Sequence, residues 1–443
     1  MNELVKKALA GGLLANRQLA QIAANTTDWL FKRDTLIKSG RTWFELVHDS
    51  DLMAVRYYEL PDEDDIELPD GTVMPIQRKQ HAVPLIIVPP LGVTTETFDL
   101  LPQRSLVKYM VAAGFRVYLV DWGKPRKEHR HLDLADYSRD MMSQAIAEVR
   151  RHAGVKPVSL MGWCMGGLFC LLYQGQTLDR NVRNVVTVAS PIDLESGSGV
   201  IAGVASIAHA LDGPGQLASK YSSLLLDTLD PALLSTPPWL TTLTFKLTDP
   251  LSSVTGYWDL MTHLYDREFV ESHSTTSDYL NNMLLYPGGV LRDMAVKVVG
   301  DNQLAKGRLE FGDSVARLDK IRSNFLGFAG EGDKLVPANV AQCIADVIAS
   351  EDKDFRVAPG GHMGVIIGSK AVNAVWSETA AWLAKRSAID AHDGVGAALK
   401  PANTRTRSSS APKPKAKPKA KPKAKPKAKP KAKPKARDKS RPA

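Results

Sequence analysis

Cysteine is scarce in this 443-residue sequence, and no uninterrupted apolar run reaches ~18 residues. Three cysteines cannot form a disulfide framework, and this low content is typical of a reducing compartment; they are Cys164, Cys170 and Cys343. We therefore expect a cytoplasmic protein without a transmembrane segment. Apolar residues make up 44% of the chain and charged residues 24%, as in ordinary globular proteins.

Acidic residues almost disappear from Lys400 onward, where 18 basic residues, Lys400 included, accompany a single acid, Asp438. This segment has a local charge of +17, so the residues before it carry −8 within the formal total of +9. An Ala-Lys-Pro-Lys repeat runs from Pro412 to Arg437. Recurrent proline prevents helices and sheet ladders, and like charges repel. The sequence therefore predicts a disordered linker and tail over residues 391–443.

A flexible polycation binds DNA through its charge and without reading base sequence, and we expect this of the tail. The residues expected to contact phosphate are Lys413, Lys415, Lys417, Lys419, Lys421, Lys423, Lys425, Lys427, Lys429, Lys431, Lys433 and Lys435. Two other interpretations stay open: a solubilising arm, and an arm that docks on an anionic granule or membrane surface.

The first part of the chain divides into two regions. Residues 1–80 predict a helix followed by a strand over 49–60 and a hairpin loop over 61–72. Residues 81–190 then alternate short apolar strands with helices. The strands are expected at 84–90, 115–121, 157–162 and 185–189, and the helices at 102–113, 133–152 and 165–176. Such alternation predicts a doubly wound, mostly parallel sheet.

Residues 191–320 interrupt this alternation and are rich in aromatic and loop-forming residues. We interpret them as an inserted cap, or lid, of irregular helices. The alternation resumes over 321–390, with strands expected at 325–329 and 354–358 and helices at 337–349 and 369–386. The second stretch therefore completes the same sheet.

A Gly-rich turn follows the strand at 157–162 and precedes the next helix. Gly162-Trp-Cys-Met-Gly-Gly167 matches the nucleophile-elbow pattern G-x-S-x-G with Cys164 in place of serine. The glycines are needed because the nucleophile sits on a strained turn, and the helix N-terminus favours a thiolate. A packing turn with a buried cysteine is the alternative interpretation of this motif alone.

Two later residues support a catalytic interpretation. Asp333 follows the strand at 325–329, and His362 follows the last strand. Nucleophile, acid and histidine occur in that order in the α/β-hydrolase fold, which we predict here. His362 would accept the proton of Cys164, Asp333 would orient the imidazole, and Cys164 would attack an acyl carbon. The backbone N–H groups of Met165 and of Leu91 or Gly92 would bind the oxyanion.

A cysteine nucleophile favours acyl transfer over plain ester hydrolysis. When a thiol accepts an acyl group from a coenzyme A thioester, one thioester replaces another, and the enzyme-bound acyl group stays activated for transfer to an alcohol. Some hydrolases also use cysteine, so the nucleophile by itself leaves both reactions open. No bound cofactor is expected.

At these residues the sequence resembles the polyhydroxyalkanoate synthase family. The resemblance covers residues 40–385 and includes four further segments: Leu85–Leu91, Asp99–Val107, Val117–Gly123 and Leu134–Tyr137. It implies that Cys164 carries the growing chain, that His362 is the general base and that Asp333 activates the incoming hydroxyl of a 3-hydroxyacyl group. The length before the tail is similar to that of the shorter synthases, which implies a second synthase subunit, with a homodimer as the alternative.

The sequence also departs from that family. Synthases have histidine after the acid, whereas Lys334 follows Asp333 here, and the cap resembles the family only loosely. The leading hypothesis is therefore a Cys-dependent acyltransferase that uses 3-hydroxyacyl-CoA. A thioesterase or esterase on the same triad and a granule-to-nucleoid adaptor with reduced catalysis are the alternatives. The adaptor would place the protein at polymer granules or at the nucleoid.

Other candidate sites are weaker. His129 and His131 lie in a basic loop, for which a solvated surface loop is favoured over a metal site because the loop lacks a set of cysteines or carboxylates at metal-ligand spacing. Three aromatic residues of the cap would either line an acyl tunnel or form the core of the cap: Trp239, Tyr257 and Trp258. Gly360-Gly361 has no following Lys-Ser/Thr, which excludes a P-loop.

Overall fold

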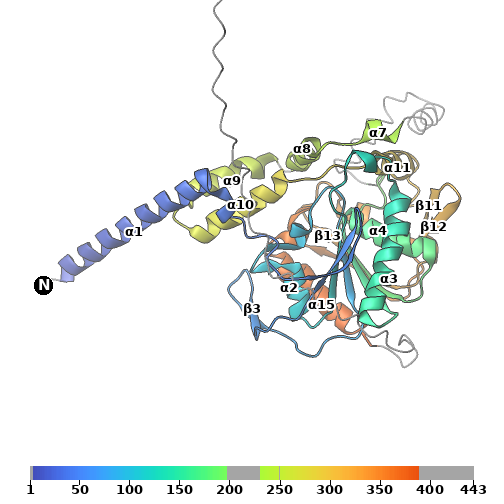
Figure 1. Cartoon of the computed structure of the whole chain (residues 1–443), viewed down its shortest axis with the longest axis horizontal. Coiled ribbons are helices and arrows are strands. Elements are labelled where there is room, and N and C mark those ends of the chain that lie inside the picture. The colour runs from blue at the N-terminus through green and yellow to red at the C-terminus, as the bar shows by residue number, and fades with distance from the viewer. Residues whose placement is uncertain (1–2, 197–229, 249, 389–443) are drawn as a thin grey trace, which may run out of the picture. The chain divides into compact units, whose positions relative to one another are not determined.

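The computed structural model describes residues 3–196, 230–248 and 250–388 (Figure 1). The predicted tail at 391–443 and the first part of the predicted cap lie outside the described residues. The remainder is built around one large sheet, with helices on both of its faces (Figure 1).

The main sheet has eight strands in the order β1-β2-β8-β5-β9-β10-β13-β14. The two pairs that involve β2 are antiparallel, and the remaining pairs are parallel. The strands are β1 (Glu45–Asp49), β2 (Ala54–Tyr58), β5 (Leu85–Val88), β8 (Val117–Asp121), β9 (Val158–Trp163), β10 (Val182–Val188), β13 (Asn324–Gly330) and β14 (Lys353–Ala358). The predicted doubly wound, mostly parallel α/β fold is confirmed.

Two apolar layers cover the faces of this sheet. In β5, Leu85 and Ile87 belong to one layer and Ile86 and Val88 to the other, because successive side chains of a strand point to opposite faces. One layer includes α3 (Met142–Ala153), α4 (Met165–Thr177) and α12 (Ala338–Gln342), and the other includes α2 (Leu106–Ala112), α14 (Gly364–Ile367) and α15 (Ser377–Ala384). The continuous apolar runs of the central strands follow from burial on both sides.

Shorter elements surround this frame. Three small hairpins pair β3 (Asp65–Glu67) with β4 (Val73–Pro75), β6 (Asp99–Leu101) with β7 (Arg104–Ser105), and β11 (Arg308–Phe311) with β12 (Ser314–Arg317). The π-helical segments are η4 (Asp136–Met141), η5 (Met294–Gly300) and η7 (Val372–Trp376). The remaining short segments are η1 (Arg33–Thr35), η2 (Thr95–Phe98), η3 (Lys127–His129), η6 (Leu318–Lys320) and α13 (Ile344–Val347).

The insertion between β10 and β13 contains helices in its described part. They are α7 (Pro231–Leu234), α8 (Pro238–Thr248), α9 (Pro250–Thr262), α10 (Arg267–Asn281) and α11 (Gly288–Asp293). Its action as a cap stays a prediction. None of the described helices of the chain is both long enough and apolar enough to cross a membrane.

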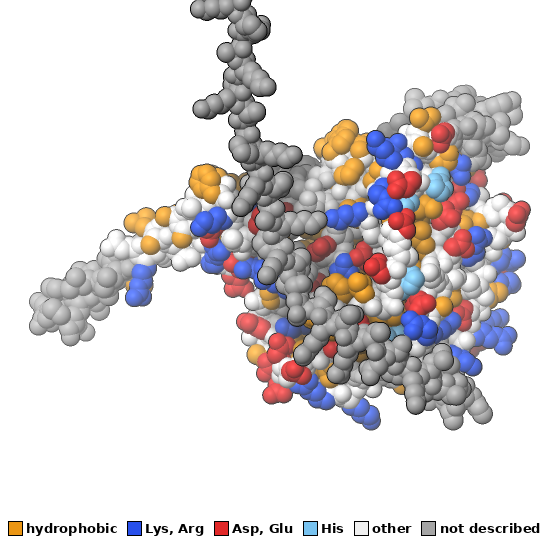
Figure 2. All heavy atoms as spheres, viewed as in Figure 1, with side chains coloured by type: hydrophobic (Ala, Val, Ile, Leu, Met, Phe, Trp, Pro, Cys, Tyr) orange, Lys and Arg blue, Asp and Glu red, His pale blue; other side chains and the backbone are white. Residues whose placement is uncertain are grey.

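Three sequence-based expectations are corrected. The single strand over 49–60 is wrong, because residues 50–53 turn the chain between β1 and β2, with the hydroxyl of Ser50 donating to the carbonyl of Met53. The helix over 133–152 begins as the π-helical η4. Trp239 and Trp258 do not form a cap core, since they are 67% and 72% exposed; Figure 2 shows apolar side chains gathered at the surface in the region of α1 and α8.

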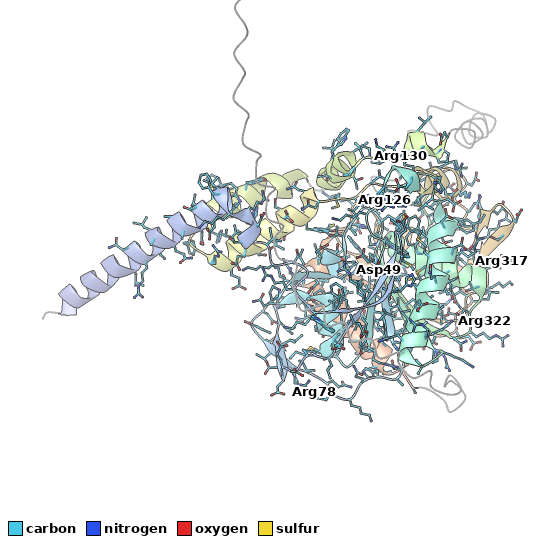
Figure 3. All side chains as sticks on the ribbon, viewed as in Figure 1. Asp49, Arg78, Arg126, Arg130, Arg317 and Arg322 are labelled. Carbon is cyan, nitrogen blue, oxygen red and sulfur yellow. The ribbon has the colours of Figure 1, made fainter. Side chains whose placement is uncertain are left out.

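The basic loop also differs from the expected solvated loop at one residue. His129 is buried, its Nδ1 accepts a hydrogen bond from the N–H of Arg126, and its Nε2 lies 3.1 Å from a carboxylate oxygen of Asp51. The guanidinium of Arg126, which is labelled in Figure 3, donates to the same carboxylate at 2.8 Å. This loop is thus tied to the turn that precedes β2.

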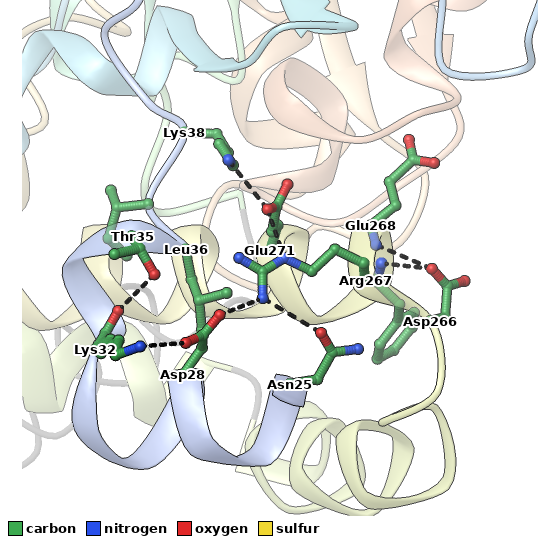
Figure 4. Close-up of polar contacts among 12 residues, drawn as sticks. Asn25, Asp28, Lys32, Thr35, Leu36, Lys38, Asp266, Arg267, Glu268 and Glu271 are labelled. Carbon is green, nitrogen blue, oxygen red and sulfur yellow. Dashed lines mark hydrogen bonds and ion pairs between the residues drawn. The ribbon is translucent and has the colours of Figure 1, made fainter. Parts of the chain in front are cut away.

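The N-terminal helix α1 (Glu3–Phe31) is held on α10 by polar contacts (Figure 4). The guanidinium of Arg267 binds Asp28 at 2.8 Å and Glu271 at 2.8 Å. Asn25 is fully buried, and its amide donates to the carbonyl of Leu264 at 2.8 Å and accepts from Arg267 at 3.3 Å. A buried side-chain amide with these partners fixes α1 more firmly than the partly exposed ion pairs do.

Replacing Asn25 with Ala should loosen α1, because the carbonyl of Leu264 would lose its buried donor at a cost of about 1–3 kcal/mol. Hydrogen exchange should show faster amide exchange over residues 16–31 in Asn25→Ala, with the exchange of β9 and β13 unchanged. Asn16→Ala, at an exposed position of the same helix, is the control and should behave like the unmodified protein. Equal exchange in both variants would show that this contact does not hold the helix.

Candidate active site

Cys164 occupies the sharp turn between β9 and α4. Its φ is 52° and its ψ is −121°, a combination that a residue with a side chain rarely adopts. The turn is held because the N–H of Cys164 donates to the carbonyl of Val188 on the neighbouring strand at 2.8 Å. The neighbouring strand therefore helps to impose the backbone conformation of this residue.

The glycines of the turn are needed because α4 approaches the sheet very closely. A Cβ on Gly166 would overlap the carbonyl oxygen of Val88 in β5, and a Cβ on Gly167 would overlap the hydroxyl of Ser190. A Cβ on Gly162 would overlap the backbone of Gly166. The spacing of these glycines is thus dictated by packing, which in turn places the N-terminus of α4 at Cys164.

Asp333 and His362 lie together at the carboxyl ends of β13 and β14. Nδ1 of His362 is 2.8 Å from Oδ2 of Asp333, and both side chains are buried. The other carboxylate oxygen of Asp333 accepts the backbone N–H groups of Leu335 and Val336, at 2.9 and 2.8 Å. These two amides fix the carboxylate, so it can orient the imidazole ring.

The indole of Trp163, next to the proposed nucleophile, also holds His362. Its Nε1 donates to the carbonyl of His362 at 3.2 Å, and the two ring centroids are 5.5 Å apart. Nε2 of His362 is buried and has no hydrogen-bond partner among the described residues. This nitrogen is therefore free to exchange a proton with a reacting group.

The charge of Cys164 acts on His362. Burial by itself lowers the pKa of the imidazole, but the nearby Cys164 sulfur and the Asp333 carboxylate outweigh it and raise that pKa to about 10. An imidazolium beside the sulfur favours the thiolate, which is the nucleophilic form. The three residues predicted from the sequence are thus brought together, although they are 169 and 29 positions apart along the chain.

The residues predicted to bind the oxyanion lie on either side of the Cys164 turn. Met165 begins α4, and the first N–H groups of a helix have no acceptor within it. Leu91 is buried, and Gly92 has a φ of 81°. The loop that carries them is fixed by the indole of Trp122, which donates to the carbonyl of Pro89 at 2.8 Å. Their role in binding an oxyanion stays a prediction.

Sequence reasoning missed two tyrosines that the insertion brings to this site. The hydroxyl of Tyr286 lies 3.0 Å from Sδ of Met165, and its ring is the nearest neighbour of Gly92. Tyr279, on α10, is buried and lies close enough to Cys164 for the charge of the sulfur to act on it. The only signal in the sequence for this close approach was the pair Gly288-Gly289, shortly after Tyr286. A Cβ on Gly288 would overlap the backbone of Pro231, and a Cβ on Gly289 would overlap the backbone of His131.

The surroundings hold no metal centre in the described part of the chain, where no group of three His, Cys, Asp or Glu side chains is arranged to bind an ion. Lys334, which departs from the synthase pattern, is exposed beside the buried Asp333. Its side chain makes no ion pair among the described residues, so it leaves the Asp333–His362 contact intact.

We expect the imidazole of His362 to keep its proton through neutral pH and to lose it only near pH 10, because the Cys164 sulfur and the Asp333 carboxylate favour the protonated ring and outweigh its burial. NMR of the 15N-labelled ring between about pH 6 and 11 measures this titration. Asp333→Asn should move the loss of the proton to lower pH, since the variant lacks the carboxylate charge. Loss of the proton near pH ~6.5 in the unmodified protein would refute the proposed arrangement.

Comparison with known proteins agrees with this architecture. The family described as the alpha/beta hydrolase fold matches residues 84–369. A poly(3-hydroxyalkanoate) polymerase subunit PhaC of Haloferax mediterranei is 26% identical over 373 residues, covering 84% of this chain and 70% of the relative. The subunit of Haloarcula marismortui is 27% identical and covers 82% and 73%. That of Allochromatium vinosum is 28% identical and covers 69% and 81%. The chain belongs to the α/β-hydrolase fold family and is a homologue of the poly(3-hydroxyalkanoate) polymerases.

Proposed function

We propose that this protein is a Cys-dependent acyltransferase that takes 3-hydroxyacyl groups from coenzyme A thioesters and transfers them to a hydroxyl acceptor, as in polyhydroxyalkanoate synthesis. The observation that carries the proposal is the strained turn that presents Cys164 to the buried His362–Asp333 pair. The polymerase names of its homologues support the same chemistry.

In the first half-reaction, the Cys164 thiolate attacks the thioester carbonyl. The backbone N–H groups near Met165 and Gly92 stabilise the negative oxygen that forms. When the carbon–sulfur bond to coenzyme A breaks, His362 donates its proton to the leaving thiolate. The products are acylated Cys164, coenzyme A and a neutral imidazole whose other nitrogen stays bound to Asp333.

In the second half-reaction, His362 accepts the proton of an incoming hydroxyl, and the oxygen attacks the acyl carbon on Cys164. Asp333 stabilises the imidazolium through the 2.8 Å contact. Breakdown of the tetrahedral intermediate releases the Cys164 thiolate and forms an ester. Water in place of the hydroxyl would give hydrolysis, so the acceptor admitted to the site decides between transferase and thioesterase.

Replacing Cys164 with Ala should abolish coenzyme A release from 3-hydroxybutyryl-CoA, because the described turn offers no other nucleophile. Release is measured with a thiol reagent, and the acyl product is analysed by mass spectrometry. We expect esters of two or more 3-hydroxybutyryl units; free 3-hydroxybutyrate alone would indicate a thioesterase instead.

Cys343→Ala is the matched control, since this half-buried cysteine lies in α12–α13 and donates to the carbonyl of Val340 instead of facing His362. It should keep the activity of the unmodified protein. Turnover by Cys164→Ala within tenfold of that control would refute the assignment of the nucleophile. No release by any of the three proteins would favour the adaptor hypothesis.

The charge distribution supports a second function, in which the segment from Lys400 onward binds nucleic acid without sequence specificity. The residues before it carry −8 and repel a polyanion, whereas this segment carries +17. Lysine contacts phosphate as a point charge and does not read bases, so the attraction arises from the release of counterions.

Deletion of residues 402–443 should abolish DNA binding and leave coenzyme A release within about twofold. If ~8 phosphates are neutralised, the affinity of the full chain should fall by about three orders of magnitude or more between 50 and 200 mM salt. Mobility-shift titrations of two unrelated DNA sequences at several salt concentrations measure both effects. Binding that survives the deletion, or that ignores salt, would leave the segment as a solubilising or granule-docking arm.

A further inference from the structure

Tyr279 places a buried phenol beside the proposed nucleophile. It lies near the end of α10, is 4% exposed and belongs to the apolar layer that contains Trp163 and against which Cys164 packs. Its hydroxyl has no hydrogen-bond partner that meets ordinary geometry among the described residues. Thr97 lies next to it and its hydroxyl donates to the carbonyl of Thr94 at 2.8 Å, but the phenol makes no hydrogen bond of ordinary geometry to the Thr97 oxygen.

The surroundings keep this phenol neutral. Burial is the main cause that raises the pKa of Tyr279; Thr97 acts in the opposite direction, and the charges of Glu96 and Cys164 add to the rise. A neutral phenol keeps its proton and remains a hydrogen-bond donor. A donor buried without a partner costs free energy, which a ligand that supplies an acceptor would recover.

Burial without a partner does not by itself indicate a binding site, as Tyr137 shows. Its hydroxyl is also buried and unpartnered, but its ring stacks on Phe169 at 5.8 Å and meets Trp122 edge-on at 5.5 Å within the core of the sheet. Tyr137 belongs to the apolar layer on the other face of the sheet, whereas Tyr279 belongs to the layer against which Cys164 packs, where the charge of Cys164 acts on it. Only Tyr279 therefore combines an unsatisfied donor with proximity to the reacting sulfur.

Tyr286 has a different position relative to the same sulfur. Its hydroxyl donates to Sδ of Met165 at 3.0 Å, and the N–H of Leu284 donates to the carbonyl of Gly92 at 2.8 Å. These contacts tie the insertion to the two loops that carry the proposed oxyanion donors. Tyr286 thus positions the carbonyl end of the site and leaves Tyr279 as the donor for another part of the substrate.

The acyl group proposed for this site contains one other polar atom near the sulfur. Once the carbonyl oxygen is bound by backbone amides, the 3-hydroxyl lies two carbon atoms farther along the chain. We propose that Tyr279 donates a hydrogen bond to this 3-hydroxyl and thereby selects 3-hydroxyacyl groups over unsubstituted ones. The inference rests on the proposed acyltransferase function and names the part of its substrate that the insertion recognises.

Helix α10 holds the phenol in place. The Arg33 guanidinium donates to Ser277 at 2.8 Å, and the Thr275 hydroxyl donates to the carbonyl of Leu36 at 3.2 Å. These contacts hold α10 at Thr275 and Ser277, in the turn that precedes Tyr279. Because the helix is held in place, the phenol cannot move to another acceptor when the substrate lacks the 3-hydroxyl. Its hydroxyl then stays unpaired, and such a site discriminates strongly against that substrate.

The test compares acylation of Cys164 by 3-hydroxybutyryl-CoA and by butyryl-CoA. Single-turnover coenzyme A release and the intact mass of the acyl-enzyme are measured for the unmodified protein, Tyr279→Phe and Tyr137→Phe. We expect the unmodified protein to prefer the hydroxylated thioester. The ratio of the two rates should fall about tenfold or more in Tyr279→Phe, through slower reaction of the hydroxylated thioester alone. Tyr137→Phe should keep the original ratio, because it removes the same atom from a buried position away from Cys164.

The outcomes separate this inference from the function on which it rests. Acylation by both thioesters with an unchanged ratio in Tyr279→Phe would overturn the role of Tyr279 and leave the acyltransferase intact. A ratio near one in the unmodified protein would overturn it as well, whether or not the variant folds. A mass unchanged by either thioester would overturn the proposed function and this inference together.

Discussion

The close approach of α4 to β5 and β9 is the constraint on which the rest of this site depends. Gly162 and Gly166 allow backbone to meet backbone where any side chain would overlap a neighbour. With the helix this near to the sheet, the connecting residue must turn sharply, and Cys164 adopts a positive φ. The sheet is packed on both faces by a buried core. The free energy that this packing contributes exceeds the free-energy cost of one unfavourable backbone conformation.

The polar groups around Cys164 come from two parts of the chain with different origins. Asp333 and His362 follow neighbouring parallel strands, so the sheet itself sets their separation. Tyr279 and Tyr286 belong to the insertion between β10 and β13, and contacts with Gly92 and Met165 attach them to the sheet. The residues of the proposed catalytic chemistry and those proposed to recognise the acyl group thus come from separate parts of the chain.

The insertion is also joined to the N-terminal helix. Asn25 and Arg267 link α1 to α10, the helix that carries Tyr279. Exposed aromatic residues, among them Trp239 and Trp258, lie on α8 and α9 of the same insertion. Most of the large apolar side chains that are exposed among the described residues thus lie on α1 and on the insertion.

The sequence by itself determined the frame and its chemistry. Continuous apolar runs identified the central strands because those strands are buried on both faces, and the glycine spacing located Cys164 because a turn of this kind tolerates no larger neighbours. The order of Cys164, Asp333 and His362 identified the fold, since each residue follows a strand of one parallel sheet.

The tertiary structure decided which groups from other segments lie near Cys164, Asp333 and His362. Apart from Gly288-Gly289, nothing local marks Tyr279 or Tyr286, because their proposed significance comes from groups more than a hundred positions away. The position of His129 likewise depends on a carboxylate from another strand region, Asp51. The cap-core alternative is wrong for Trp258, which is exposed, because aromatic character predicts burial only when a partner surface exists. Sequence periodicity indicates which side of a helix or strand is apolar. Which residue of another segment contacts that side is determined only by the tertiary structure.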